Sequence, residues 1–206
     1  WFIRSQFRGA NDKTLCLPTP IMAAATVPGG HLLQKAVDGL ELIDQHKFTA
    51  RFYMVAVGGQ LMCYGDSVVF VHGAAYAPND ANHASQVDNR SYRDAGSHIK
   101  LIPGSQTPHA GPLAKAAQAL AADMTELLDE VRQASVAGAS EESAFAVLAI
   151  DTLLTKSGDL KLLRIHTFPN FITTAQIDAD VHVPLFEDVL RVMAGIPSRK
   201  LTTITD

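Results

Sequence analysis

Residues 145–171, FAVLAIDTLLTKSGDLKLLRIHTFPNF, constrain the fold of this chain more than any other stretch. Two apolar runs flank the tripeptide SGD, which is typical of a tight turn, so the sequence predicts an antiparallel hairpin. Residues two apart on a strand share a face, so Arg164 and His166 point the same way and Asp151 can face them from the neighbouring strand. We expect a cross-strand ion pair between Asp151 and Arg164.

The same three positions bear on metal binding. An acidic trio in this geometry would hold Mg²⁺, which prefers oxygen ligands. Arg164 has no lone pair to offer and stays cationic, and the imidazole of His166 is a poor ligand for Mg²⁺. Asp151 is therefore the one metal-binding acid among these three positions, and a structural salt bridge is the simplest interpretation.

A second hairpin is predicted over residues 47–64, because side chains alternate along residues 48–56 and the run QLMCYG returns after the Gly58-Gly59 dipeptide, which is typical of a turn. A third strand, SVVFVHG, would complete an antiparallel meander. Strands are also expected within residues 1–17, as a pair around a loop, and over 32–37. The 3-4 spacing of apolar residues predicts helices over 112–136 and 184–194. Residues 77–109 are expected to form a long loop. This mixture indicates an α+β fold.

Composition excludes several classes of protein. The chain has 206 residues, 47% hydrophobic and 18% charged, which is enough for one domain or two small ones. A net charge of −4 favours neither nucleic acid nor an anionic membrane surface, and no apolar run approaches the ~20 residues of a membrane span. Two cysteines indicate reduced thiols in an intracellular protein. Because the chain opens at Trp1, we expect it to be a piece of a longer protein.

Other catalytic and metal motifs are missing from the sequence. The eight histidines show no zinc-type spacing with each other or with cysteine, and neither a GxSxG nor a P-loop motif occurs. Cys63 lies in a strand-like run and is interpreted as a small core residue rather than a nucleophile.

Four segments, in chain order, resemble the C-terminal part of the tubulin tyrosine ligase-like family of ATP-grasp ligases. They are WFIRS, LLQKAV, KFTARFYMVAV and AIDTLLTKSGDLKLLRIHTFPNF. The resemblance covers most of residues 1–195. It implies that residues 1–206 form one ATP-grasp-like region, with antiparallel sheets and flanking helices.

The resemblance also implies a site for ATP and Mg²⁺. The reaction expected of such a site is phosphorylation of a carboxylate followed by attack of an amine, with Mg²⁺ bridging phosphate oxygens. Matched to the family motifs, the expected nucleotide-binding residues are Arg4 for phosphate, Gln34, Lys35 and Ala36 beside adenine, Lys47 beside the nucleotide, and Asp151 as the remaining metal ligand. Arg51 would lie near the phosphates or the acyl phosphate, and Arg51 and Arg164 are the candidate catalytic residues.

Departures from the family pattern argue against catalysis. Arg164 and His166 replace the glutamate and asparagine of the metal site, Thr49 replaces an aspartate, and the expected phosphate loop SQFRGANDK has one glycine. The chain is therefore predicted to be a degenerate module, a scaffold or protein-binding subunit in the cytoplasm or on the microtubule cytoskeleton, or in an organelle. Its expected partners are other protein subunits, tubulin or an acidic peptide tail. An active ligase with a rebuilt metal site, and an unrelated α+β binding domain, are the alternatives.

Overall fold

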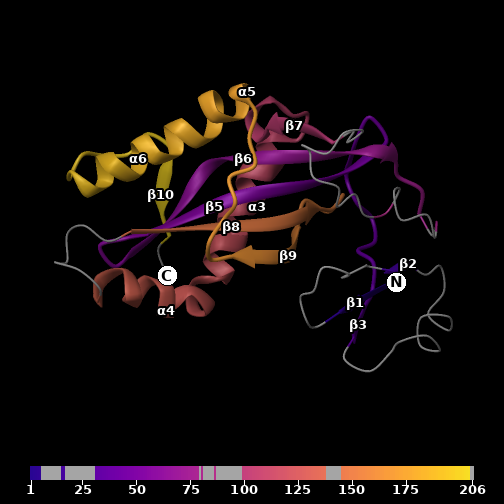
Figure 1. Ribbon diagram of the computed structural model, residues 1–206, viewed down its shortest axis with the longest axis horizontal. Coiled ribbons are helices and arrows are strands. Elements are labelled where there is room, and N and C mark those ends of the chain that lie inside the picture. Colours follow the sequence, from indigo (N-terminus) through magenta and orange to yellow (C-terminus); the bar gives the residue numbers. More distant parts are fainter. Residues whose placement is uncertain are drawn as a thin grey trace. The chain divides into compact units, whose positions relative to one another are not determined.

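The computed structural model describes residues 1–5, 15–16, 31–78, 80, 86, 99–137 and 145–204 (Figure 1). The chain divides into two compact units, one of Trp1–Phe48 with Val71–Lys100 and one of Thr49–Phe70 with Leu101–Asp206. We describe each unit by itself. The expected phosphate loop and most of the predicted loop over 77–109 lie outside the described residues.

The first unit contains a small antiparallel sheet in the order β2-β1-β3. Its strands are β1 (Phe2–Ser5), β2 (Leu15–Cys16) and β3 (His31–Gln34). The pairing of β1 with β2 confirms the predicted strand pair, while β3 is shorter than the expected strand over 32–37. A short strand, β4 (Leu42–Ile43), turns back onto the start of β5 through Asp44 and Gln45, whose φ angles are +50° and +67°.

The large antiparallel sheet has seven strands, which confirms the α+β class and is compatible with an ATP-grasp-like fold. Its main path runs β10-β6-β5-β8-β9. The strands are the short β4, which pairs with β5, and β5 (His46–Val57), β6 (Gln60–Ala75), β7 (Lys100–Pro103), β8 (Phe145–Leu154), β9 (Leu160–His166) and β10 (Leu201–Thr203). Both predicted hairpins are present. Their turns contain Gly58, Gly59 and Gly158 at φ angles of +54°, +77° and +86°, a conformation that favours glycine.

Two predictions about strands are wrong. The second and third strands of the expected meander are one continuous strand, β6, because the turn-like residues Asp66 and Ser67 are buried within it. The loop predicted over 77–109 contains β7 and a 3₁₀ turn, η1 (Gly104–Gln106). The turn binds Asp66 through Ser105, so tertiary contacts satisfy the carboxylate of a residue that looks like part of a strand end.

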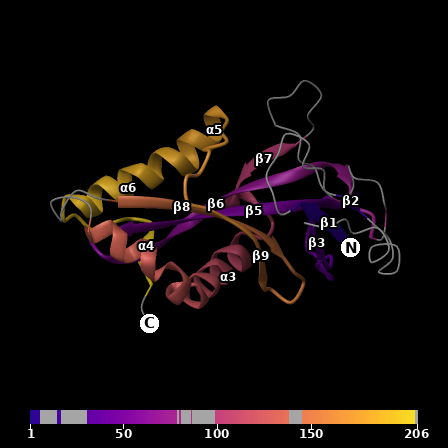
Figure 2. The ribbon, with the colours of Figure 1, turned by 60° about the horizontal axis from the view of Figure 1, so that its bottom comes forward.

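Helices cover both faces of the large sheet within the second unit (Figure 2). On one face lie α3 (Ala110–Asp123) and α4 (Thr125–Ala137), and on the other α5 (Ala175–Ile177), a π-helical turn over Asp178–His182, and α6 (Val183–Met193). The helix predicted over 112–136 is thus two helices that meet at Met124. There the Thr125 hydroxyl donates to the Ala122 carbonyl at 2.9 Å, a local bond that competes with regular helix geometry. None of the helices in the described ranges is long and apolar enough to cross a bilayer.

Alternation along β5 divides its side chains between the two faces. Tyr53, Val55 and Val57 belong to a core formed with the α5–α6 segment, whose Val181, Leu185 and Val189 recur every fourth residue. Phe52 lies on the opposite face of the sheet, beside Leu113 of α3. Arg51 shares the α6 side with Tyr53, so the register of β5 places its one arginine next to a hydrophobic core.

Candidate functional site

A row of three charged residues crosses neighbouring strands of the large sheet. Arg51 on β5 lies opposite Asp151 on β8, and Asp151 lies opposite Arg164 on β9. The register between β8 and β9 then shifts, because Thr152 is opposite Leu162. This β-bulge adds one residue to β9. The sheet therefore aligns one carboxylate between two guanidinium-bearing residues.

Arg51 binds the Asp151 carboxylate with two hydrogen bonds. Its Nε donates to Oδ1 at 2.7 Å and its Nη2 donates to Oδ2 at 3.0 Å. Its Nη1 donates to the carbonyl oxygen of Asn170 at 3.0 Å, and the guanidinium lies 5.2 Å from the centre of the Phe70 ring. Only 7% of the Arg51 side chain and 16% of the Asp151 side chain are exposed, so this is a largely buried, bidentate ion pair.

His166 completes the cluster on the same face as Asp151, as the sequence predicts. Its Nε2 lies 2.8 Å from Asp151 Oδ2 and 3.3 Å from Arg51 Nη2. A carboxylate only accepts, so Nε2 carries the hydrogen and donates it to Asp151. The ion pair with Asp151 that was expected of Arg164 is formed by Arg51, and Arg164 is exposed on β9.

The electrostatics of this cluster favour an ionised Asp151. Burial alone would raise the pKa of its carboxyl group, but the hydrogen bonds and positive charge of Arg51, with the hydrogen bond from His166, hold that pKa below its ordinary value. Burial opposes the charged form of Arg51, yet its contacts with Asp151 raise the pKa of the guanidinium. The two groups therefore hold each other in their charged states.

The residues of this cluster do not fit a magnesium ion. Both oxygens of Asp151 already accept hydrogen bonds from cationic or hydrogen-bearing groups. A Mg²⁺ ion needs several oxygen ligands and would stand beside the Arg51 guanidinium. Elsewhere in the described ranges, no three or more His, Cys, Asp or Glu side chains gather closely enough to hold a metal.

The predicted nucleotide-binding residues Gln34, Lys35, Ala36 and Lys47 belong to the first unit. Lys35 is exposed and forms an ion pair with Asp38 at 2.9 Å. Gln34 ends β3 and is half-buried, as is Ala36 just beyond it.

Lys47 is buried, and three residues of the first unit contact its ammonium group. It donates to the carbonyl of Gln86 at 3.0 Å, and its ammonium lies 5.5 Å from the Phe2 ring and 5.9 Å from the Tyr76 ring. Its charge is thus engaged by protein groups. Arg4 is part of β1, and its side chain lies outside the described structure.

The sequence predictions missed a second hydrogen-bonded chain, on the same face as Arg51. The Tyr53 hydroxyl lies 2.8 Å from His182 Nε2, and His182 Nδ1 lies 3.1 Å from Asp178 Oδ1. Because the carboxylate accepts from Nδ1, Nε2 of the neutral imidazole accepts from the Tyr53 hydroxyl. Burial lowers the pKa of His182 and raises that of Tyr53, so both groups are kept neutral. The signal was a histidine within the apolar pattern of residues 177–189.

Aromatic contacts hold the hydrogen-bonded side chains of Tyr53 and His182 in place. Phe171 stacks on Tyr53 with ring centres 5.7 Å apart and meets His182 edge-on at 5.2 Å. His182 ends a π-helical turn, a rare geometry that shifts the helix register by one residue. The turn brings His182 over Tyr53, so the Tyr53–His182–Asp178 hydrogen bonds anchor α6 to the sheet.

No protein-family model matches this chain, and a search of curated proteins found no match either. The resemblance to ATP-grasp ligases therefore rests on the four sequence segments alone.

Proposed function

We propose that this chain is a non-catalytic module related to the tubulin tyrosine ligase-like family, acting as a scaffold or binding subunit for other proteins. The observation that carries the proposal is that Arg51 and His166 bind both carboxylate oxygens of Asp151. The one acid left at the expected metal site is held as an internal counter-ion. Releasing it to a metal would leave Arg51 buried without its partner, which is costly.

Titration with ATP, with and without Mg²⁺, tests this proposal. Isothermal calorimetry on the wild-type chain should show no magnesium-dependent binding, and no hydrolysis should be detected. Saturable, magnesium-dependent binding would contradict the proposal and favour an active ligase with a rebuilt metal site. The double variant Arg164→Glu, His166→Asn restores the family residues, and Lys161→Glu, at an exposed position of the same strand, is its charge-matched control. We expect neither to bind, because Arg51 still holds Asp151.

The partner class we propose is a protein with an acidic peptide tail. Support comes from basic residues at and near β9, where Lys156, Lys161 and Arg164 are exposed. Lys161 and Arg164 share the face of Asp151, since their cross-strand neighbours Leu153 and Asp151 are two apart. Such a surface attracts anionic segments in a salt-dependent way.

A fluorescent glutamate-rich peptide tests the partner class. Its anisotropy should rise with added protein at low salt, and the double variant Lys156→Glu, Lys161→Glu should weaken binding by about fivefold or more. The matched control is the double variant Lys35→Glu, Lys100→Glu, which makes the same charge change at two exposed positions of the first unit. Equal loss in the control, or no binding at low salt, would overturn this part of the proposal.

A further inference from the structure

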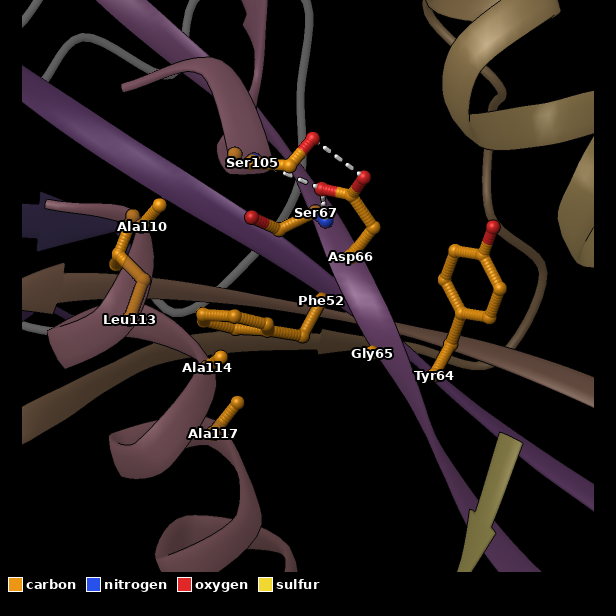
Figure 3. Close-up of a pocket in the computed structure, with 11 residues that line it drawn as sticks. Phe52, Tyr64, Gly65, Asp66, Ser67, Ser105, Ala110, Leu113, Ala114 and Ala117 are labelled. Carbon is orange, nitrogen blue, oxygen red and sulfur yellow. Dashed lines mark hydrogen bonds between the residues drawn. The ribbon is translucent and has the colours of Figure 1, made fainter. Parts of the chain in front are cut away.

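A small pocket opens on the α3 side of the large sheet, on the opposite face of β5 from Arg51 (Figure 3). Its volume is about 170 Å³. One wall is apolar and comes from Phe52 of β5 with Leu113, Ala114 and Ala117 of α3. The other wall is polar and comes from residues 65–67 of β6 and the 3₁₀ turn at Gly104 and Ser105.

The Ser67 hydroxyl is the polar group aimed into this pocket. Figure 3 shows Ser67 extending from β6 toward the first residue of α3, Ala110, on the same side of the strand as Phe52. Ser67 is 2% exposed, its backbone N–H donates to Asp66 Oδ1 at 2.8 Å, and among the described residues its hydroxyl forms no hydrogen bond. The hydroxyl is not one of the fully enclosed polar atoms that lack a partner, and Ser67 lines the pocket, so a ligand with a hydrogen-bonding group can pair with the hydroxyl in place of water.

Gly104 holds this hydroxyl in position. A Cβ atom at Gly104 would lie 2.0 Å from Ser67 Oγ, so the two residues approach more closely than any side chain would allow. The turn around Gly104 is itself fixed, because Thr107 donates to the Gly104 carbonyl from its hydroxyl at 2.8 Å and from its backbone at 3.1 Å. The polar wall is therefore preformed.

Two charges at the rim limit what the pocket can hold. The buried Asp66 carboxylate, which accepts from Ser105 and lies 3.6 Å from Lys200 Nζ, would repel an anion. The positive end of the α3 dipole lies at Ala110, with no acidic residue in the first turn and no side-chain cap, and would repel a cation. Neutral groups suffer neither repulsion.

We propose that this pocket binds a small neutral molecule with a compact apolar body and one hydroxyl or amide group. The apolar body lies between Phe52 and the Leu113–Ala117 face of α3, and the polar group exchanges a hydrogen bond with Ser67. This site is independent of the Asp151 cluster and of the proposed scaffold role, since it uses the other face of the sheet.

Three probes of one shape test the proposal: cyclohexanol, cyclohexylammonium and cyclohexanecarboxylate. In ¹H–¹⁵N NMR titrations, cyclohexanol should shift the amides of Phe52, Ser67 and Ala114 saturably, with a Kd of about 1–10 mM, as expected for a fragment of this size. The two charged probes should bind at least about tenfold more weakly.

Two variants and a control complete the test. Ala114→Leu fills the pocket from an exposed helical position and should abolish cyclohexanol binding, whereas Ala119→Leu, also exposed on α3 but outside the pocket, should leave it unchanged. Ser67→Ala should weaken binding about threefold to tenfold. Absent or non-saturable shifts, equal binding of a charged probe, or unchanged binding by Ala114→Leu would each overturn the proposal. Because Ala114→Leu adds only an apolar isopropyl group at an exposed site, a folding defect in Ser67→Ala does not remove the test.

Discussion

Arg51 and Tyr53 are two residues apart on one face of β5, yet their polar groups are satisfied by opposite means. Arg51 meets a carboxylate as an ion pair, and both groups stay charged. Tyr53 meets an imidazole whose pKa is lowered, and both groups stay neutral. The difference follows from the surroundings. A full counter-charge compensates the burial of Arg51, whereas Tyr53 lies in the apolar core beneath α6, where neutral hydrogen bonds cost least.

The largest expected effect comes from breaking the charged pair. Arg51→Met should lower the free energy of unfolding by about 3 kcal/mol, because it leaves the Asp151 carboxylate buried with His166 alone. Urea denaturation followed by circular dichroism measures this.

The matched control removes both charges. The double variant Arg51→Met, Asp151→Leu should recover most of the lost stability, since no buried charge is left unpaired. If the single variant loses less than about 1 kcal/mol, the cluster does not depend on mutual charge compensation and the contrast with Tyr53 fails.

The stability contributed by the neutral Tyr53–His182 hydrogen bond should decrease in mild acid. The folded-state pKa of His182 is lowered from 6.5, so the unfolded chain binds a proton more readily than the folded one. Its contribution to stability is complete above about pH 6.5 and is lost as pH falls toward the lower folded pKa, with a slope of at most about 1.4 kcal/mol per pH unit.

Urea midpoints measured between pH 8 and pH 5 test this slope. His182→Gln keeps a polar side chain that does not titrate, and it should show a smaller decrease over the same interval than the wild type. Asp151 responds in a different window: with its lowered pKa, its contribution is present above about pH 3.8 and lost only below that. If the urea midpoints of wild type and His182→Gln fall in parallel with pH, His182 is not the source of the loss of stability in acid.

The smallest expected effect is that of Tyr53→Phe. Removing the hydroxyl takes the donor from His182 Nε2 and should cost about 1 kcal/mol, while the ring keeps its stacking on Phe171. Thermal unfolding monitored by near-ultraviolet circular dichroism measures it. A loss of stability as large as that of Arg51→Met would show that the neutral Tyr53–His182 hydrogen bond contributes as much as the Arg51–Asp151 ion pair.

Local sequence patterns predicted the hairpins well but not their neighbours. Glycine at φ-permissive turn positions and alternating side chains are local signals, and they located β5, the beginning of β6, β8 and β9. The position of His166 beside Asp151 followed from the same hairpin. The true counter-ion of Asp151 did not, because Arg51 is 100 residues away and the pairing of β5 with β8 leaves no mark on spacing.

Polar residues inside long elements caused the other failures. Asp66 and Ser67 look like a strand end, and only the later turn at Ser105 explains why the strand continues. The buried His182 is likewise explained by a tyrosine 129 residues earlier in the chain. In each case the partner comes from a distant segment, so single-sequence reasoning had no local pattern from which to predict it.

The bulge in β9 has a consequence for comparing this chain with others. Lys161 and Arg164 share a face although they are three apart, because one extra residue lies between Leu162 and Arg164. A related strand with regular pairing would be one residue shorter at that point. An alignment with such a regularly paired strand would therefore need a single-residue gap at position 163. Without it, every aligned position on one side of the bulge would be matched to a residue from the opposite face of the sheet.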